Sequence, residues 1–457
     1  MRQPRVLIIG LDCAAPSMVF DRYREQMPHL HGLMQRGRWG PLASTMPPIT
    51  VPAWVSMTTG RDPGELGLYG FRQRKPGSYA LRMSTAADVP YKRVWDWAGQ
   101  AGKTVSALYV PLTSPPRALN GTQISGFLTP GESVPWTYPA SLADWFTQHF
   151  GAYRADIDDF RQRDRAEVLP SLYAMTKQHF EAAAALWQRD QPDLMMLVDM
   201  GIDRFQHVFW QHVDPLHPRY SPHPQGDIGA QYYGFVDQCV GELLAQLDDD
   251  DLHVLVVSDH GAKALQGNFA INQWLYDQGW LCLRHPLADQ SLPLRDCEID
   301  WGRTRAWAEG GYYARVFINL EGREPEGCVA SREYTSLRET LGQELQALTG
   351  PNAEPWHNRV LKPEEIYRQT RGLAPDLMVV LDDLNWRASG TLGHAGHYLD
   401  VNDTGADGCN HDWQGIAIMA GPSISASGYC EGMQLLDITP TVLRMLGLPL
   451  PTFLSDR

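Results

Sequence analysis

The chain has 457 residues, with 39 Lys and Arg against 53 Asp and Glu, so its net charge is −14. With 43% hydrophobic and 20% charged residues, its composition is that of a folded globular protein and excludes a disordered or collagen-like chain. The acidic balance argues against a nucleic-acid polymer as partner, because such a partner requires a basic face that neutralises phosphates.

The first apolar run, Val6 to Leu11, is too short for a signal peptide and ends at a carboxylate. No run approaches the roughly 20 apolar residues of a membrane helix, so we expect no membrane span. The seven cysteines are scattered and form no Cys-x-x-Cys pair, which is typical of reduced thiols. These features predict a cytoplasmic protein and leave its oligomeric state open.

Three β-rich runs each end just before a carboxylate. They are Val6–Leu11 before Asp12, Leu194–Val198 before Asp199 and Asp203, and His253–Val257 before Asp259. Continuous Val, Ile and Leu runs are typical of parallel strands covered by helices on both faces, and helical patterns at 164–190 and 228–247 lie between them. The alternation predicts an α/β sandwich, in which functional groups gather beyond the carboxyl ends of the strands.

Other parts of the chain are less regular. Residues 70–136 are rich in Gly, Pro and Thr and predict loops with one strand near 104–110, and the acids Asp248–Asp251 are expected to form a solvated turn. We expect residues 268–371 to form a cap subdomain, inserted into a core made of 1–267 and 372–457. The expected elements that follow residue 300 are strands at 314–319, 376–381 and 415–420, a helix at 331–348 and a final helix near residue 437.

Two motifs combine Asp and His at spacings that suit metal ligands. Asp203 and His207 are four residues apart, so on a helix they share one face, although an ordinary helix pair would have the same spacing. Asp259-His260 directly follows a buried strand, where a turn can aim both side chains at one centre. A helix cap at the end of the strand is the alternative for this second motif.

Three further candidates are weaker when taken singly. Asp12 ends the first strand, and Thr50 lies in the proline-fixed segment Pro47-Pro48-Ile49-Thr50-Val51-Pro52, before a helix-like stretch at 53–59. A turn former and an N-cap threonine are the respective alternatives. His411 lies just before the strand at 415–420, whereas His394 and His397 lie in a Gly-rich loop. A surface loop position is the alternative for each of these three histidines.

In chain order these residues resemble the alkaline phosphatase superfamily, in particular its type I phosphodiesterase/nucleotide pyrophosphatase branch. Supporting motifs are the threonine in Pro47–Trp54, the Asp203-x-x-x-His207 pair followed by Phe209-Trp210, the Ser258-Asp259-His260-Gly261 tetrapeptide and the Gly415–Pro422 strand. The resemblance covers essentially the whole chain. It implies a three-layer α/β/α sandwich with a mostly parallel central sheet and an inserted cap.

The resemblance also implies a two-metal site and a nucleophile. One divalent ion would be held by Asp203, His207 and His411, and the other by Asp12, Thr50, Asp259 and His260, with Zn²⁺ expected and Mn²⁺ as the alternative. Thr50 would attack phosphorus and form a phospho-threonine intermediate. The expected partner is a small-molecule phosphoryl substrate.

Several departures restrict this interpretation. The segment after Thr50 lacks the Cys/Ser-x-Pro-x-Arg pattern of sulfatases, and Ala53 stands where nucleotide pyrophosphatases carry Asn, so nucleotide specificity is not implied. Phosphomonoesterase, phosphonate hydrolase and phosphotransferase activities remain alternatives to phosphodiester hydrolysis. A non-catalytic binding member of the fold is the alternative from another class. A dinucleotide-dependent dehydrogenase is excluded, because no Gly-x-Gly-x-x-Gly follows the first strand.

Overall fold

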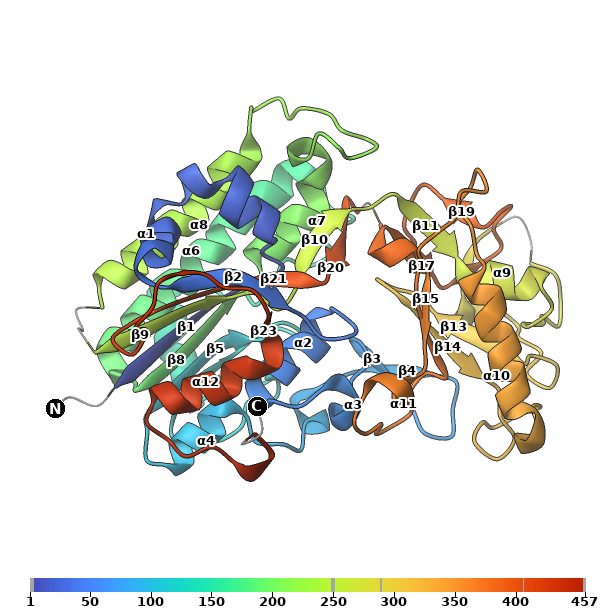
Figure 1. Ribbon diagram of the computed structural model, residues 1–457, viewed down its shortest axis with the longest axis horizontal. Helices are drawn as coiled ribbons and strands as arrows, with labels where there is room; N and C mark the ends of the chain where they lie inside the picture. The colour runs from blue at the N-terminus through green and yellow to red at the C-terminus, as the bar shows by residue number, and fades with distance from the viewer. Residues whose placement is uncertain (1–3, 248–250, 288–289, 406, 455–457) are drawn as a thin grey trace.

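The computed structural model describes residues 4–247, 251–287, 290–405 and 407–454, which form two lobes (Figure 1). A ten-stranded sheet runs through the larger lobe in the order β22-β2-β21-β9-β1-β8-β5-β6-β7, with β23 beside β2. Strands β9, β1, β8, β5 and β6 are parallel, whereas β21 and β7 run antiparallel to their neighbours. The strands are β1 (Arg5–Leu11), β2 (Arg38–Ala43), β5 (Val105–Val110), β6 (Gly121–Ser125), β7 (Thr137–Tyr138), β8 (Leu194–Asp199), β9 (Leu252–Val257), β21 (Gln414–Ala420), β22 (Gly428–Tyr429) and β23 (Met433–Gln434).

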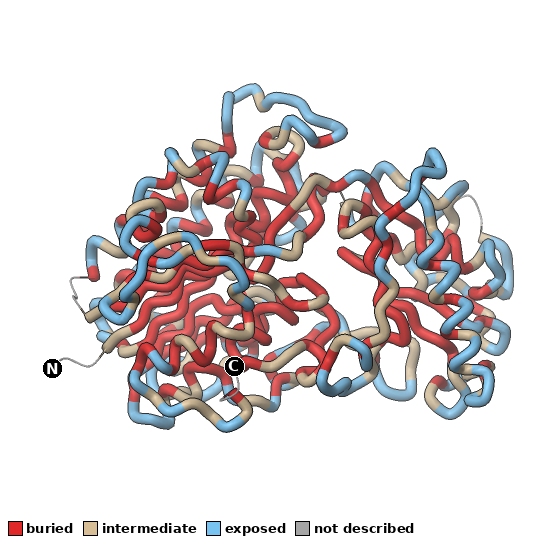
Figure 2. The backbone as a smooth tube through the Cα atoms, viewed as in Figure 1, coloured by how far each residue is buried: buried red, intermediate tan, exposed pale blue. Residues whose placement is uncertain are grey.

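Helices cover both faces of this sheet. Successive residues of a strand point to opposite sides, so the apolar strands place side chains on both faces that must be buried. Leu7 and Ile9 pack into one apolar cluster, and Val6 and Ile8 pack into another on the opposite face. Figure 2 shows the buried sheet between more exposed helices. The first face carries α1 (Pro28–Arg36), α5 (Leu142–Phe150), α6 (Arg165–Asp190), α7 (Gly201–Val213) and α8 (Ile228–Ala245), and the second carries α2 (Thr50–Thr59), α4 (Val94–Gln100) and α12 (Ile438–Met445). The predicted three-layer sandwich is confirmed.

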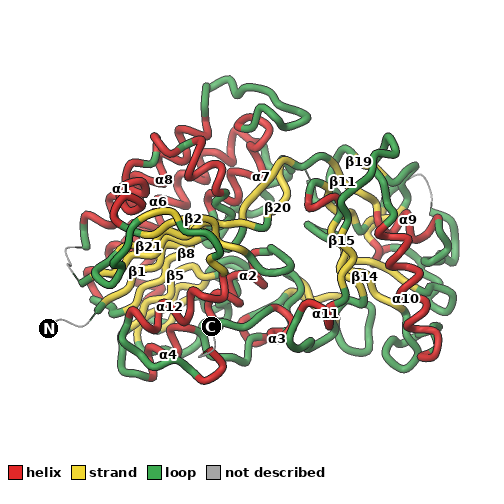
Figure 3. The backbone as a smooth tube through the Cα atoms, viewed as in Figure 1, coloured by secondary structure: helices red, strands yellow, loops and turns green. Residues whose placement is uncertain are grey.

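Two short paired strands, β10 (Gly261–Ala264) and β20 (Cys409–Asp412), lie where the chain leaves the core and returns to it (Figure 3). The second lobe contains an antiparallel sheet in the order β13-β14-β16-β15 and a smaller one in the order β17-β11-β19. Its strands are β11 (Gly267–Ala270), β12 (Leu292–Pro293), β13 (Ala306–Glu309), β14 (Ala314–Ile318), β15 (Arg359–Leu361), β16 (Leu377–Val380), β17 (Trp386–Ser389), β18 (Thr391–Leu392) and β19 (Tyr398–Leu399), and its helices are α9 (Ile271–Asp277), α10 (Ser331–Gln346) and α11 (Pro363–Ile366).

The strand pairing shifts the expected end of the cap. Strand β16 pairs with β14 and β15, and β17 pairs with β11, so residues beyond 371 belong to the second lobe. The expected division lies at residue 371, and from this pairing we propose that the lobe extends to about residue 405, just before β20 leads back to the core.

Residues 70–136 also hold more regular structure than expected. Besides the predicted strand β5, this stretch forms the hairpin β3 (Arg72–Arg74) and β4 (Leu81–Met83), helix α4 and strand β6. Of the acidic run Asp248–Asp251, expected to be a turn, the first three residues lie outside the described residues. No helix within the described ranges has the length and apolar character to cross a membrane.

Candidate metal centre

The seven residues singled out in the sequence come together beyond the carboxyl ends of the core strands. Each is nearly completely buried, with at most 2% of its surface exposed. Asp12 follows β1, Thr50 begins α2, Asp203 and His207 lie on α7, Asp259 and His260 follow β9, and His411 lies in β20. The parallel strands therefore bring residues that are far apart in the chain to one edge of the sheet.

The first group consists of Asp203, His207 and His411. Helix α7 places Asp203 and His207 one turn apart, with 3.3 Å between Oδ1 and Nε2. His411 Nε2 lies 3.3 Å from His207 Nε2 and 3.7 Å from Asp203 Oδ1. A tetrahedral ion with ligands at about 2.0–2.1 Å requires ligand atoms about 3.3 Å apart, so this spacing fits a single zinc-like ion.

The second group is arranged around the imidazole of His260. Its other members are Asp12, Thr50 and Asp259. His260 Nε2 lies 3.2 Å from Asp259 Oδ2, 3.4 Å from Thr50 Oγ1 and 3.8 Å from Asp12 Oδ1. These separations are again close to the tetrahedral spacing. Helix α2 starts at Thr50 itself rather than at the expected position 53, so the hydroxyl lies at the positive end of the helix.

Each carboxylate has one oxygen fixed by the protein and one oxygen left free. Trp54 Nε1 donates to Asp12 Oδ2 at 2.6 Å, Arg204 donates to Asp203 Oδ2, and the Cys13 backbone N–H donates to Asp259 Oδ1 at 3.2 Å. The partner oxygens, Asp12 Oδ1, Asp203 Oδ1 and Asp259 Oδ2, are buried and accept no hydrogen bond from the described part of the chain. A buried oxygen that accepts no hydrogen bond lowers the stability of the folded protein. In each group, these free oxygens are the carboxylate atoms that lie nearest the histidine Nε2.

Each of the three histidines likewise has one ring nitrogen held by a protein acceptor and the other directed at its group. Nδ1 of His207 is 2.7 Å from Asp407 Oδ1, that of His411 is 2.8 Å from the Pro48 carbonyl, and that of His260 is 3.1 Å from the Gly261 carbonyl. Because each acceptor fixes a proton on Nδ1, Nε2 is the ring nitrogen that faces its group and that can bind an ion. This is the outer hydrogen bonding that metal-ligating histidines require.

Burial and mutual repulsion shift the acidities of these groups. Burial, with Asp203 nearby, raises the pKa of Asp12 well above its usual value, and burial together with Asp12 raises that of Asp259. Burial opposes the ionisation of Asp203, but the positive charges of His207 and Arg204 outweigh it and hold the pKa of Asp203 well below its usual value. The raised pKa values of Asp12 and Asp259 indicate that their ionised forms lack an adequate counter-charge among the described residues, which a bound cation would supply.

Burial and nearby charges shift the pKa values of the three histidines in different directions. Burial lowers the pKa of His260 to about 4 and that of His411 well below its usual value, so both rings are neutral at pH 7. Burial also disfavours the charged form of His207, but Asp407 and the other nearby acidic groups more than compensate and raise its pKa well above the usual value. In the metal-free protein, His207 therefore retains a proton that a cation must displace.

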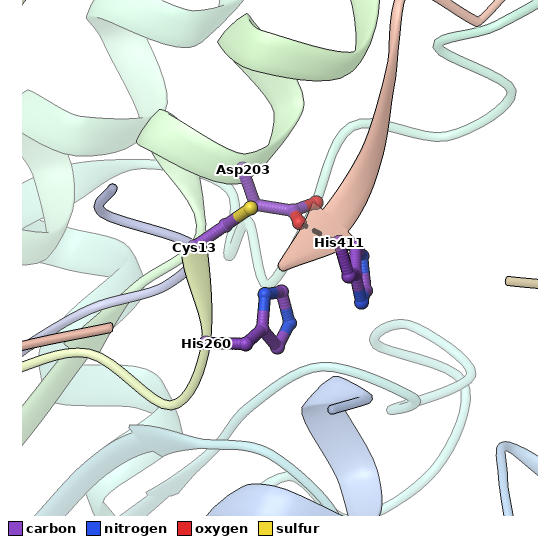
Figure 4. Close-up of side chains that lie close together, drawn as sticks. All are labelled: Cys13, Asp203, His260 and His411. Atoms are coloured by element: carbon purple, nitrogen blue, oxygen red, sulfur yellow. Dashed lines mark ion pairs between the residues drawn. The ribbon is translucent and has the colours of Figure 1, made fainter. Parts of the chain in front are cut away.

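The two groups adjoin each other. The rings of His260 and His411 stack with their centroids 3.7 Å apart. The close-up in Figure 4 shows His260 from one group beside Asp203 and His411 from the other, with the Cys13 thiol near Asp203. One ligand atom from each of these four residues lies within 4.8 Å of the others. The arrangement therefore offers neighbouring positions for two ions rather than two separate sites.

Sequence reasoning missed Asp407 and Tyr312, both of which contact His207. Asp407 is buried and also binds Arg161 at 2.8 Å and Arg387 at 2.6 Å. Tyr312 comes from the second lobe, and its hydroxyl lies 3.2 Å from His207 Nε2. Neither residue belongs to a spacing motif, so no local signal marks it. In contrast, His394 contacts Thr391 and His397 contacts Asp277, away from both groups.

A family model and several solved structures resemble this chain over most of its length. Residues 6–409 match the family described as type I phosphodiesterase/nucleotide pyrophosphatase. No curated protein sequence matches significantly. Human ectonucleotide pyrophosphatase/phosphodiesterase 5 superposes with a TM-score of 0.58 at 14% identity, covering 98% of this chain and 96% of that one. Phosphonoacetate hydrolase from Sinorhizobium meliloti 1021, in complex with phosphonoformate, gives 0.62 at 17% identity, covering 97% and 96%.

The chain belongs to the type I phosphodiesterase/nucleotide pyrophosphatase family of the alkaline phosphatase superfamily, and is thus a phosphoric ester hydrolase. The family match ends two residues before His411, so the last residue of the first group rests on its geometry rather than on the match. The structural likenesses have low sequence identity and show the shared fold.

Proposed function

We propose that this protein hydrolyses phosphodiester or closely related phosphoryl bonds in small molecules, with Thr50 as nucleophile beside two divalent ions. The observation that carries the proposal is the set of three buried carboxylate oxygens that lack hydrogen-bond donors and face histidine Nε2 atoms at tetrahedral spacing. A core that served only for packing would not concentrate such groups, because each costs about 1–3 kcal/mol when it is left unpaired.

Asp203, His207 and His411 would hold one ion, and Asp12, Thr50, Asp259 and His260 the other. Nitrogen and oxygen donors at this spacing suit Zn²⁺, and Mn²⁺ is the alternative. Two divalent ions would supply positive charge to the phosphoryl group, and they would lower the pKa of the nucleophilic hydroxyl. The net charge of −14 is therefore no obstacle to an anionic substrate.

The position of Thr50 at the start of α2 supports its role as the nucleophile. Its Oγ1 would lose its proton to solvent and form a bond to phosphorus while the bond from phosphorus to the leaving oxygen breaks. The leaving group would depart with that electron pair and take up a proton from solvent. The free backbone N–H groups at the start of α2 would be available to the phosphoryl oxygens. Water then hydrolyses the phospho-threonine ester, which restores the hydroxyl and releases the phosphoryl product.

The alternatives within the superfamily, a phosphomonoesterase, a phosphonate hydrolase and a phosphotransferase, differ in the bond that is cleaved or in the group that accepts the phosphoryl group. One neighbouring structure is an inactive murine ectonucleotide pyrophosphatase/phosphodiesterase 5 in complex with AMP, and another is a phosphonoacetate hydrolase, so nucleotides and phosphonates belong in a substrate screen. We place the protein in the cytoplasm, which is supported by seven cysteines that are all free thiols. Its acidic net charge supports small molecules over nucleic-acid polymers as substrates.

The test combines metal analysis with turnover. Purified protein loaded with Zn²⁺ or with Mn²⁺ is analysed for metal per chain and assayed on bis-p-nitrophenyl phosphate, p-nitrophenyl phosphate and a phosphonate. We expect two ions per chain and the highest kcat/KM on the diester. Two bound ions with a preference for the monoester or the phosphonate would redirect the substrate assignment. Protein without metal and without activity on any of these would refute the proposal and favour a binding protein.

A further inference from the structure

We propose that the hydroxyl of Tyr312, contributed by the second lobe, binds an oxygen of the substrate's phosphoryl group and so completes the site. This inference rests on the function proposed above. Tyr312 lies between β13 and β14 and is only 5% exposed. Its Oη is 3.2 Å from His207 Nε2, close to the 3.3 Å that separates Asp203 Oδ1 and His411 Nε2 from that atom. The phenol therefore lies at the edge of the first group.

The ring of Tyr312 is held rigidly in place. It stacks on His411 with centroids 3.6 Å apart and 24° between the planes, and the Arg387 guanidinium lies 4.7 Å from its centroid. The Asn410 side-chain amide donates to the backbone carbonyl of Tyr312 at 3.3 Å. These contacts come from the strand that carries His411 and from β17 of the second lobe. The hydroxyl is consequently aimed at the site by the junction between the lobes.

The hydrogen bonds of the hydroxyl leave its proton unused. Arg161 Nη2 donates to Tyr312 Oη at 2.9 Å, and a guanidinium can only donate, so the phenolic hydrogen must find an acceptor elsewhere. The only other hydrogen-bond partner of the hydroxyl within the described ranges is His207 Nε2, the atom that would bind an ion and could then accept no hydrogen bond. In the metal-loaded protein the phenolic proton is therefore left for another acceptor, and a phosphoryl oxygen is the acceptor that the proposed reaction brings.

The substitution Tyr312→Phe isolates this role, because phenylalanine keeps the ring that stacks on His411 and removes only the hydroxyl. The matched control is Tyr313→Phe. Tyr313 is the next residue and is similarly buried, but its hydroxyl donates to the Tyr69 carbonyl at 2.6 Å, away from the site. A general loss of stability from removing a buried phenol would affect both variants.

The experiment measures inorganic phosphate binding by calorimetry on zinc-loaded protein, together with metal per chain and kcat/KM. For Tyr312→Phe we expect unchanged metal content, with phosphate affinity and kcat/KM each lowered about 10- to 100-fold, as for loss of a hydrogen bond to a charged group. Tyr313→Phe should bind phosphate like the unsubstituted protein.

Two results would overturn the inference. Phosphate affinity and kcat/KM equal to those of the unsubstituted protein would show that the hydroxyl does not touch the phosphoryl group. Loss of an ion in Tyr312→Phe would show instead that the hydroxyl supports metal binding. Failure of the proposed function is distinguishable from both, because in that case the unsubstituted protein itself would bind neither zinc nor phosphate.

Discussion

Replacing Asp407 with Asn tests whether the first group is built to hold a cation. The Asp407 carboxylate is fully buried, accepts from His207 Nδ1 at 2.7 Å and pairs with both Arg161 and Arg387. Burial alone would raise its pKa, but Arg161 and His207 hold the pKa far below its usual range. The carboxylate is therefore charged at all ordinary pH values. The Asp407→Asn substitution would keep the shape of the side chain and remove its charge.

Two losses of different size follow from this geometry. A carboxylate behind a ligating histidine typically changes metal affinity by about 10- to 100-fold, or about 1.4–2.7 kcal/mol at the metal. Removing one member of a buried charge cluster leaves the two arginines without their partner, which costs about 3–5 kcal/mol of folding free energy. The variant should thus bind zinc more weakly and also unfold at lower urea concentration.

The assay is zinc competition against a chromophoric chelator at constant pH, with urea unfolding measured in parallel. The matched control is Asp412→Asn, on the same strand as His411. Asp412 has a side chain that is 34% exposed and an ion pair to Lys263 at 3.7 Å, so its loss should cost at most about 1 kcal/mol and leave zinc affinity unchanged. Equal zinc affinity in Asp407→Asn and the unsubstituted protein would refute the argument that Asp407 orients a metal ligand.

Further predictions concern the nucleophile, the metals, pH and the start of α7. Thr50→Ala should lower kcat by at least about 10³-fold while it keeps both ions, which turnover and metal analysis check. Chelation should lower the Tm, and saturating zinc should restore stability by up to about 4 kcal/mol at roughly 1,000 times Kd. Because the pKa of His207 is raised in the metal-free protein, zinc binding should release its proton, and the apparent affinity should weaken as pH falls from about 8 to about 6 in calorimetry. Gly201→Ala should destabilise the protein by about 3 kcal/mol in urea unfolding, because a Cβ would lie 2.1 Å from Tyr232 Oη and 2.6 Å from Asp199 Oδ2, whereas Gly234→Ala in α8 meets nothing nearer than 3.5 Å and should be neutral or stabilising.

Each of these has an outcome that contradicts it. Normal turnover by Thr50→Ala would remove the nucleophile assignment. A Tm that does not respond to chelator would mean that the buried carboxylates need no cation. Zinc affinity independent of pH, without proton release, would show that His207 is already neutral. Equal stability of the Gly201 and Gly234 variants would show that the turn between β8 and α7 is not tightly packed.

The main elements of the core could be predicted from the sequence because the patterns that mark them are local. Apolar runs that end in carboxylates predicted β1, β8 and β9, and their parallel pairing brings the residues that follow them to one edge. The four-residue spacing of Asp203 and His207 predicted a shared helix face, which α7 provides. The positions of Thr50 and His411 came from the family resemblance, since neither would stand out by residue type alone.

The parts that could not be predicted depend on long-range contacts. Asp407 meets His207 across 200 residues, and Tyr312 meets it across 105. Both lie in stretches without periodicity, and their partners are set only when the second lobe packs on the core. The placement of β16 was missed for a similar reason, because an apolar strand of four residues does not reveal which sheet it joins.

The most direct test of the two-ion account is a crystal structure of zinc-loaded protein with anomalous data collected at the zinc edge. The account predicts two anomalous peaks about 4 Å apart, one among Asp203, His207 and His411 and the other among Asp12, Thr50, Asp259 and His260. A single peak, or a peak at His394 or His397 with none beside the three free carboxylate oxygens, would contradict it.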